Sequence, residues 1–338
     1  MTQRVEAGAN PARDFKKSGD FFRPGKCEQF GFMKQHQNQY SVDELCNTLQ
    51  VSRSGYYRYL NPEISPREAE TEELNGEINR IYQENKCRYG SPRVTVQLRN
   101  EGWRVGKNRG ARLMKNERLI GLHAKKKRIT TTDSKHNGRI APNLVKGLEV
   151  TAPNQVWVAD ISYIQTQQGW SYLAAVLDLY SRKIVGWQMA TNREASLVVS
   201  GLTKAIEDRC PPKGLIVHTD RGSQYVSDDS LELVEEHDLE ASMSAKGNCY
   251  DNATMESFLG TLKTEEIWER EYKTHQEARA SVFEYIETYY NRDRIHTSLG
   301  NQAPESFERF FSSPAGEEKK RAAGLLNCKE TINMITLN

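Results

Sequence analysis

Hydrophobic residues in the first part of the chain recur with the three- and four-residue spacing of short helices. In residues 41–49 this spacing places four side chains on one face: Val42, Leu45, Cys46 and Leu49. Ser41 can cap this helix, and Glu44 completes a capping box. A second short helix is predicted over residues 53–60, which carries Arg53, Tyr56, Tyr57 and Arg58. Two short helices joined so tightly are typical of a helix-turn-helix, whereas a plain helical hairpin with an aromatic core is the favoured alternative for this segment on its own.

A second helical module, residues 66–128, follows this predicted helix-turn-helix of residues 35–63. Its first helix ends at Gly90 and has an apolar face of Leu74, Ile78, Ile81 and Tyr82. The next helix begins at Ser91 and closes at Gly102. Behind it, four side chains can face inward: Val105, Leu113, Met114 and Leu119. This pattern therefore predicts that the last two helices of the module form a second helix-turn-helix.

Cations dominate the outward face of the second module. Six lie on or beside its last helix: Arg104, Lys107, Arg109, Arg112, Lys115 and Arg118. Four more follow in a run: Lys125, Lys126, Lys127 and Arg128. A charge run by itself is more often a solvated surface, but a helix-turn-helix with so basic a second helix is well placed to contact phosphates. We therefore expect this module to bind DNA.

Three segments lack a sustained hydrophobic period. Residues 1–34 are expected to be a poorly ordered leader, because residues 1–31 contain several Gly and Pro and no pattern that supports a helix or strand. Residues 129–152 are polar, with further Gly and Pro, and are predicted to be a linker. Residues 311–338 form a tail in which we find no functional pattern.

From residue 153 onward the pattern changes to β-branched and aromatic runs. Strands are predicted over residues 156–164, 170–181, 183–190 and 214–220. Helices are predicted over residues 193–209, 228–239 and 252–266. This order, with hairpins first and crossovers later, predicts an α/β domain over residues 153–310, in which helices flank a mixed sheet.

The charges divide the chain into a basic and an acidic part. Residues 86–128 hold fourteen Lys and Arg against two acids, a net of +12, whereas residues 149–310 hold fifteen against twenty-six, a net of −11. The basic part favours a polyanion partner. The acidic part has either a solvated acidic surface or carboxylates that need cations. Six scattered cysteines suit a reducing cytosol, and no apolar run is long enough for a membrane span or a secretory signal.

Three carboxylates fall where the predicted strands and the last helix end or begin. Asp160 lies in the first strand, Asp220 follows the short apolar strand, and Glu256 lies near the start of the last helix, with thirty-five residues between Asp220 and Glu256. Neighbouring strands can place the two aspartates side by side. Three close carboxylates repel one another unless a cation lies between them, and oxygen ligands suit Mg²⁺ or Mn²⁺. Two such ions would form the clamp used for in-line phosphoryl transfer.

The segments around these carboxylates resemble one family. They are WVADISYI, LIVHTDRGSQYVSD, GNCYDNATMESFLGTLKTE and, downstream, YYNRDRIHTSLGNQAPESFE. Together they resemble the D-D-E transposases of bacterial insertion sequences that share the retroviral-integrase core. More narrowly, they resemble the second-frame (OrfB-type) product of the copy-out–paste-in group. The resemblance covers about residues 38–310 and implies an RNase-H-like catalytic domain behind helix-turn-helix DNA-binding segments.

Several functional expectations follow from this resemblance. The family's catalytic and metal-binding triad corresponds to Asp160, Asp220 and Glu256, and two Mg²⁺ or Mn²⁺ ions are implied. The cation seven residues after the glutamate corresponds to Lys263, which can reach a phosphate of the DNA. Asn252 also matches the motif and is expected to support the helix start or to contact DNA.

The resemblance also implies partners and a location. The implied partners are double-stranded DNA at the element ends and at the target, and further copies of the chain on that DNA. The family's upstream frame often supplies another helix-turn-helix and a leucine zipper. Because residues 1–40 show no heptad pattern, the chain is expected to lack that part and to have an upstream-frame partner. The implied location is the bacterial cytoplasm, in association with the nucleoid, without membrane contact.

Other polar and aromatic residues in the acidic domain receive structural interpretations. Asp178 is expected to cap a turn, with a metal-neighbour role as the alternative, and His218 to support Asp220. DNA contact and core packing stay open for Tyr289, Tyr290, Arg292, Arg294 and His296. Core packing is expected for Trp157, Trp170 and Trp187.

The sequence therefore predicts a transposase. It would hydrolyse DNA at an element end and join the resulting 3′ hydroxyl to another phosphodiester by transesterification. One alternative is a metal nuclease of the same fold that cuts without joining. Another is a non-catalytic DNA-binding regulator of transposition, against which the intact triad argues.

Overall fold

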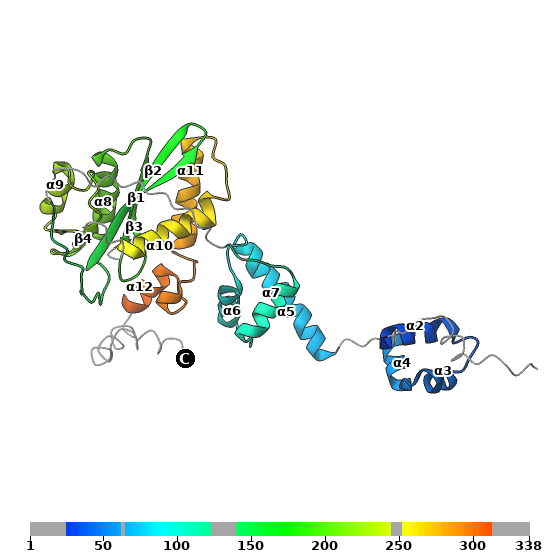
Figure 1. Ribbon diagram of the computed structural model, residues 1–338. Helices are drawn as coiled ribbons and strands as arrows, with labels where there is room; N and C mark the ends of the chain where they lie inside the picture. Colours follow the sequence, from blue (N-terminus) through cyan, green and yellow to red (C-terminus); the bar gives the residue numbers. More distant parts are fainter. Residues whose placement is uncertain (1–24, 62–64, 123–139, 245–251, 313–338) are drawn as a thin grey trace, which may run out of the picture. The chain divides into compact units, whose positions relative to one another are not determined.

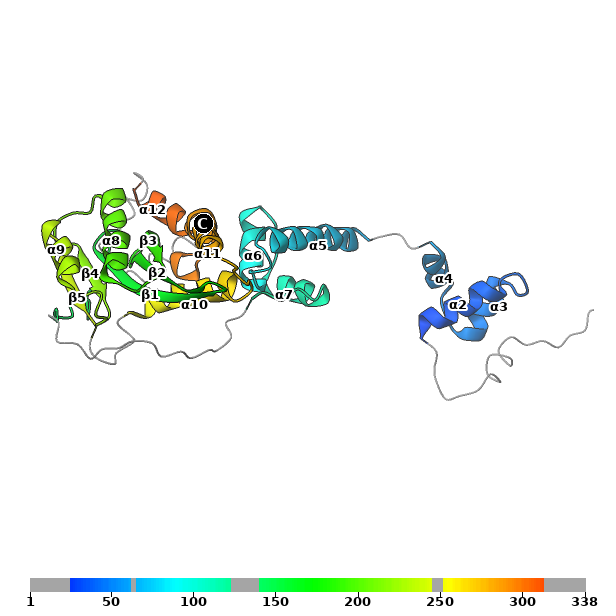
Figure 2. The same cartoon turned by 90° about the horizontal axis from the view of Figure 1, so that it is seen from above.

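The computed structural model describes residues 25–61, 65–122, 140–244 and 252–312 (Figures 1 and 2). The chain divides into two units, residues 1–76 and 77–338. The predicted linker residues 129–139 and the cation run at 125–128 lie outside the described residues, as do residues 1–24 and the tail from 313.

In the described residues 25–61 of the first unit, three short helices surround an aromatic cluster. They are α2 (Lys26–His36), α3 (Val42–Leu49) and α4 (Arg53–Leu60). The predicted capping box is confirmed, because Glu44 N–H donates to Ser41 Oγ at 3.3 Å and Ser41 N–H donates to the Glu44 carboxylate at 2.9 Å. Tyr56 is buried with Leu45, so α3 and α4 form the predicted helix pair.

The expectation that residues 1–31 contain no helix is wrong for the last part of that segment, because α2 begins at Lys26. Its Phe30 and Met33 are buried in the same cluster as Leu45 and Tyr56. The helix is stabilised by this burial against α3 and α4, and its own sequence shows little amphipathic pattern. Contacts with later residues therefore decide its conformation.

The basic module begins with α5 (Pro66–Glu84), within which the boundary between the two units falls. It continues with α6 (Ser91–Asn100) and α7 (Lys107–Asn116), which pack on each other. Gly110 allows their close approach, since a Cβ at this position would lie 2.4 Å from Thr95 Oγ1. The predicted inward positions Val105, Leu113 and Met114 are buried, which confirms the helical spacing.

A five-stranded mixed sheet forms the centre of the acidic part. Its strands are β1 (Val156–Thr166), β2 (Gly169–Asp178), β3 (Ile184–Ala190), β4 (Ile216–Thr219) and β5 (Glu240–Met243). Their spatial order is β3-β2-β1-β4-β5. The β1–β2 and β2–β3 pairs are antiparallel, whereas β4 is parallel to β1 and β5 is parallel to β4. The predicted α/β mixed sheet is confirmed, with β5 as a strand that the sequence pattern did not indicate.

Helices cover both faces of the sheet (Figure 1). One face packs on α8 (Ala195–Arg209) and α9 (Asp228–Glu236). The other packs on α10 (Ala253–Leu262), α11 (His275–Phe283) and two π-helical segments, η2 (Lys263–Ile267) and η3 (Glu284–Tyr290). Alternate residues of β1 follow this division, since Val156 and Val158 face α10 whereas Trp157 and Ala159 face α8.

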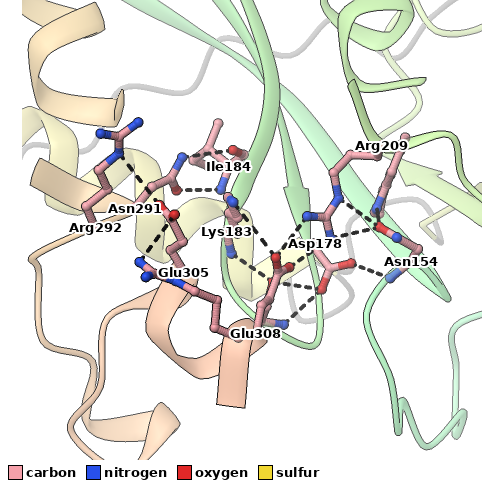
Figure 3. A network of polar contacts seen from close by, with 12 residues as sticks. Asn154, Asp178, Lys183, Ile184, Arg209, Asn291, Arg292, Glu305 and Glu308 are labelled. Carbon is pink, nitrogen blue, oxygen red and sulfur yellow. Dashed lines mark hydrogen bonds and ion pairs between the residues drawn. The ribbon is translucent and has the colours of Figure 1, made fainter. Parts of the chain in front are cut away.

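The last described segment is anchored on the catalytic domain by aromatic packing and by a network of polar contacts (Figure 3). After η4 (Thr297–Leu299), α12 (Pro304–Ser312) packs Phe307 and Phe311 on Tyr180. Glu308 accepts two bonds from the Arg209 guanidinium of α8, at 2.8 and 2.9 Å. Asn291 donates to Ile184 O and accepts from Ile184 N–H, which joins this segment to β3.

Residues 140–150, within the predicted linker, make specific contacts with the sheet. Leu144 N–H donates to Ser242 Oγ at 2.9 Å, and Met243 N–H donates to Pro142 O at 3.3 Å. Val145 and Val150 pack against the cluster beneath α10. This part of the segment therefore lies along β5 as part of the folded structure.

Candidate active site

Asp160 and Asp220 lie side by side on neighbouring strands. Parallel pairing of β1 with β4 sets Ala159 opposite Thr219, and each aspartate is the next residue in its chain. Side chains alternate between the faces of a strand, so Asp160 shares the face of Val158, which is the face covered by α10. The predicted pairing of the two aspartates is therefore consistent with the observed register.

Local hydrogen bonds fix one oxygen of each aspartate. Ile161 N–H donates to Asp160 Oδ1 at 2.7 Å, and Gly222 N–H donates to Asp220 Oδ1 at 2.9 Å. Glycine at 222 leaves room for this bond, because a Cβ there would lie 2.9 Å from Asp220 Oδ1 and would displace that carboxylate. The turn after β4 thus needs glycine at its second position to orient the carboxylate.

Glu256 is presented by α10, whose apolar residues hold the helix on the sheet. Met255, Phe258, Leu259 and Leu262 are all buried beneath it. Glu256 itself is exposed in the first turn of the helix. The i, i+3 and i, i+4 spacing of the buried residues leaves Glu256 on a different face of α10.

The electrostatics show that the three carboxylates influence one another. Burial, together with the charges of Asp220 and Glu256, raises the pKa of Asp160 to about 7. Partial desolvation raises the pKa of Glu256. The charge of Lys263 lowers the pKa of Asp160, and burial lowers the pKa of Lys263. The three acids and this lysine therefore share one electrostatic environment.

The donor set consists of carboxylate oxygens only, which are the ligands that Mg²⁺ and Mn²⁺ prefer. In the part of the chain that the structure describes, no group of three His, Cys, Asp or Glu side chains lies close enough to hold a metal ion. Metal binding by Asp160, Asp220 and Glu256 fits their chemistry and stays a prediction.

Tyr225 is a neighbour of the two aspartates that the sequence reasoning missed. Its ring is buried, and its hydroxyl makes no hydrogen bond to any described residue. Burial raises its pKa well above the usual value, and the charges of Asp160 and Asp220 contribute to this shift. The available signal was its place in the loop RGSQY directly after Asp220.

Asp178 and His218 have structural surroundings. Asp178 is fully buried at the end of β2, where its Oδ1 accepts from the N–H groups of Tyr180 and Ser181 at 3.1 and 2.8 Å. The prediction that Asp178 caps this turn is confirmed. His218 is also buried, and its Nδ1 lies 2.9 Å from Ser242 Oγ, so it ties β4 to β5.

Asn252 occupies the N-cap position of α10, but its side chain makes no capping hydrogen bond. It is buried, and its Oδ1 has no partner among the described residues. The position agrees with an expected role at the helix start, and DNA contact by Asn252 stays a prediction.

The residues with open interpretations divide between core and surface. Tyr290 is buried against Phe258, and Arg294 is buried with Glu265, whereas Arg292 is exposed. Trp157 is buried as expected, but Trp170, near the start of β2, is 49% exposed, which contradicts core packing there. Trp187 is half-buried and donates to Glu287 at 2.8 Å.

The predicted DNA-binding cations are available to solvent. Arg104, Lys107, Arg112, Lys115 and Arg118 are exposed, and Arg109 is half-buried. They lie on or beside α7, as the helical spacing predicted. Lys125, Lys126, Lys127 and Arg128 are outside the described residues.

Comparison with known proteins places these features in one family. An integrase core domain matches residues 150–249 and again residues 237–304, and an HTH-like domain matches residues 68–127. The chain is 43% identical over 272 residues to the insertion element IS600 uncharacterized 31 kDa protein of Shigella sonnei, which covers 80% of this chain and 100% of that protein. It is 38% identical over 285 residues to transposase InsF for insertion sequence IS3A of Escherichia coli strain K12, covering 83% and 98%. The chain belongs to this insertion-sequence transposase family.

Solved structures show weaker similarity. A simian T-cell lymphotropic virus intasome in complex with PP2A regulatory subunit B56 gamma aligns with TM-score 0.41 and 15% identity, covering 70% of this chain and 75% of that chain. The HTLV-2 integrase catalytic core domain in complex with magnesium, in its dimeric form, aligns with TM-score 0.36 and 13% identity, covering 46% and 97%.

The family assignment gives the function in general terms. The transposase is a polynucleotidyl transferase of the D-D-E type that acts in DNA transposition. The integrase-core matches span Asp160, Asp220, Glu256 and Lys263, and the HTH-like match spans the basic module. No described helix is both long and apolar enough to cross a membrane.

Proposed function

We propose that Asp160, Asp220 and Glu256 form the catalytic centre of this transposase. The observation that supports this most strongly is the β1–β4 register, which makes the two aspartates neighbours on the face beneath α10. The charges of Asp220 and Glu256 both raise the pKa of Asp160, which supports one shared site.

The three carboxylates would hold Mg²⁺ or Mn²⁺, and we propose two ions. Divalent cations bound here supply activation of the attacking oxygen and stabilisation of the leaving oxygen. The protein's own residues fix the carboxylates, because Ile161 and Gly222 donate to one oxygen of Asp160 and Asp220. Lys263, whose charge acts on Asp160, would contact a phosphate of the DNA beside this centre.

The proposed reaction has two steps. In the first, a water oxygen attacks the phosphorus at the element end and loses a proton, and the bond from phosphorus to the 3′ oxygen breaks. The departing 3′ oxygen takes up a proton to become a 3′ hydroxyl, while the new phosphate stays on the other strand segment. In the second, this hydroxyl oxygen attacks a target phosphorus and loses its proton, while the target's own 3′ oxygen leaves and is protonated. No covalent bond to the protein forms in either step.

We propose that double-stranded DNA is held by the basic module, over the exposed cations of α7, while the triad acts. Because an element has two ends, several copies of the chain would act together on DNA, and an upstream-frame product would be a further partner. The reaction would take place on DNA in the cytoplasm. These assignments rest on the charge of the basic module and on the family.

Conservative substitutions test the catalytic centre. Asp160→Asn, Asp220→Asn and Glu256→Gln keep side-chain size and remove one negative ligand each. Each variant should lose cleavage and joining of DNA in Mg²⁺, by at least about a thousandfold, while DNA affinity in a gel-shift assay and the circular dichroism spectrum stay near those of the parent. Near-normal activity of any one variant would remove that residue from the centre.

A further inference from the structure

A groove of about 400 Å³ lies beside the catalytic helix and takes its lining from several segments. α6 supplies Arg93, the β2–β3 turn supplies Arg182, and α10 supplies Thr254, Ser257 and Thr261. The segment after η3 completes it with His296 and its neighbours. The groove therefore joins the HTH-like module to the catalytic domain within the second unit.

Arg182 is a groove cation that is positioned by the turn between β2 and β3. It has a left-handed backbone, with φ 63°, in the turn that the buried Asp178 caps, and its N–H donates to Asp178 O at 2.8 Å. Its guanidinium donates to Thr254 Oγ1 on α10. Among the described residues this guanidinium forms no ion pair, and the buried carboxyl of Asp178 acts on it only through its charge.

The other charges around the groove leave it positive. Glu265 accepts ion pairs from both Arg294, at 2.8 Å, and Arg93, at 3.3 Å. The carboxylate of Glu265 thus faces two guanidinium groups. Arg182 contributes a third guanidinium to the groove, away from Glu265. Burial lowers the pKa of His296, as do the charges of Arg294, Arg93 and Arg182, so His296 is a neutral hydrogen-bonding group here.

The composition and length of the lining favour a phosphate backbone over a small apolar ligand. The described lining residues include no Asp or Glu and contain several hydroxyl side chains: Thr254, Ser257, Thr261, Thr297 and Ser298. From Thr254 to Thr261 the helix rises about 10 Å, which is about three nucleotide steps of one strand at about 3.4 Å each. Hydroxyl and guanidinium donors are the usual partners of DNA phosphates.

We propose that this groove binds the phosphodiester backbone of the DNA on the flank of the helix that carries Glu256. Ser257 follows Glu256 directly, but successive residues of a helix point about 100° apart, so a strand seated here lies along a different face of α10 from the one that carries Glu256. Arg93 belongs to the basic module, so the same strand continues onto that module. The inference rests on the proposed function, because it assigns a DNA subsite on the helix that carries Glu256 of the proposed triad.

Two substitutions in the full chain test the groove. Arg182→Gln removes the charge and keeps a donor for Thr254, and Thr261→Glu adds a carboxylate to a partly exposed helical position. Each should weaken duplex binding in EDTA about tenfold at low salt. Each should also make the slope of log affinity against log salt less steep by about 0.9, the value of one phosphate contact. Arg279→Ala, an exposed cation on α11 that lies outside this groove, is the matched control and should bind as the parent does.

The choice of DNA separates the possible strands. One duplex carries the terminal sequence that flanks the gene, and another has an unrelated sequence. Loss with the terminal duplex only supports a subsite for the element end, and loss with both supports a general backbone subsite. Unchanged binding of both duplexes by both variants, with thermal melting near that of the parent, would overturn the proposal.

Inorganic phosphate provides the remaining comparison. If phosphate at millimolar concentration binds the parent chain and the variants lose only that binding, the groove is a small-anion site and the backbone proposal fails. The fate of the proposed function is read separately, from cleavage by Glu256→Gln in Mg²⁺. Activity of that variant would refute the triad, whereas its inactivity beside normal DNA binding by Arg182→Gln would refute only the groove.

Discussion

At the scale of single residues, Asp160 destabilises the folded chain at neutral pH when no metal is bound. Its pKa in the folded chain is raised to about 7 from an ordinary 3.8. The folded chain therefore keeps a proton that the unfolded chain releases between about pH 4 and pH 7. Because the folded state binds more protons in that interval, the free energy of unfolding falls as pH rises through it.

Asp160→Asn should remove this penalty. Asn keeps an acceptor for Ile161 N–H and carries no charge at any pH. In EDTA at pH 8 the variant should have a higher melting temperature than the parent, and its free energy of unfolding should be larger by at most about 4 kcal/mol. At pH 4 the two chains should differ little. Asp208→Asn, at an exposed position on α8, is the control. An equal effect of Asp160→Asn at both pH values would contradict the raised pKa.

The sequence indicated the proposed triad because each member lies in a motif that is local in the chain. Asp160, Asp220 and Glu256 could be predicted from short segments and from a resemblance, and their catalytic role stays a prediction. The unpaired hydroxyl of Tyr225 and the contact of Arg182 with Thr254 could not be found this way. Both depend on side chains that only the folded sheet and α10 bring together.

At the scale of elements, the end of the catalytic helix is held by buried ion pairs. The π-helical segment η2 follows α10 and contains Glu265 and Glu266. Arg88, which lies just before α6, pairs with Glu266, and the two side chains are 3% and 2% exposed. Ser281 on α11 also donates to Glu266, at 2.5 Å. These contacts fix the segment that begins at Lys263.

Removing one member of a buried pair costs about 3–5 kcal/mol when the other charge is left without a partner. Here Glu266 would keep the partly exposed Arg270 at 3.0 Å, so this range is an upper bound. Arg88→Ala should therefore lower the free energy of unfolding by up to this amount, measured by urea denaturation. Lys86→Ala provides a matched control, because Lys86 and Glu284 are 48% and 53% exposed. Its loss should cost at most about 1 kcal/mol. Similar costs for the two variants would show that the Arg88–Glu266 pair does not hold η2.

Element types were predicted well where one helix or strand supplies its own pattern. Helical spacing identified α6, α7 and α10, and β-branched runs identified β1 to β4. The helix α2 and the strand β5 were missed because their stability comes from partners distant in sequence. The π-helical form of η2 could not be predicted, since its buried glutamates need Arg88 and Arg294 from elsewhere in the chain.

At the scale of the whole molecule, the charge division assigns DNA affinity mainly to the basic module. Lys107, Arg112 and Lys115 are exposed on or beside α7, so their replacement by Ala should leave stability nearly unchanged. The triple variant should bind duplex DNA more weakly, and the slope of log affinity against log salt should become less steep by about two to three. Gel shifts at several salt concentrations measure both quantities.

The comparison variant replaces three exposed lysines of the catalytic domain, Lys204, Lys213 and Lys273, by Ala. It removes the same formal charge from the acidic part of the chain. A loss of affinity as large as that of the α7 variant would mean that net charge, and not the position of the basic module, controls binding.

The whole-molecule organisation was predictable from composition and from the order of elements, since the charges reverse where strands replace helices. The contacts that join the basic module to the catalytic domain were not, because Arg88, Tyr89 and Arg93 look like ordinary parts of a basic helical segment. In the structure, Tyr89 is buried and its hydroxyl accepts from Ile295 N–H at 2.9 Å. These residues make the module part of the catalytic unit.

The most direct test of the account is the joining of a pre-cut element end. A labelled duplex that already has the 3′ hydroxyl is incubated in Mg²⁺ with a target plasmid and either the parent chain or Glu256→Gln. The account predicts that the parent joins label to the plasmid, and that the variant binds the duplex equally well without joining it. Joining by Glu256→Gln at the parent's rate would contradict the assigned centre, and cleavage without joining by the parent would contradict the transesterification step.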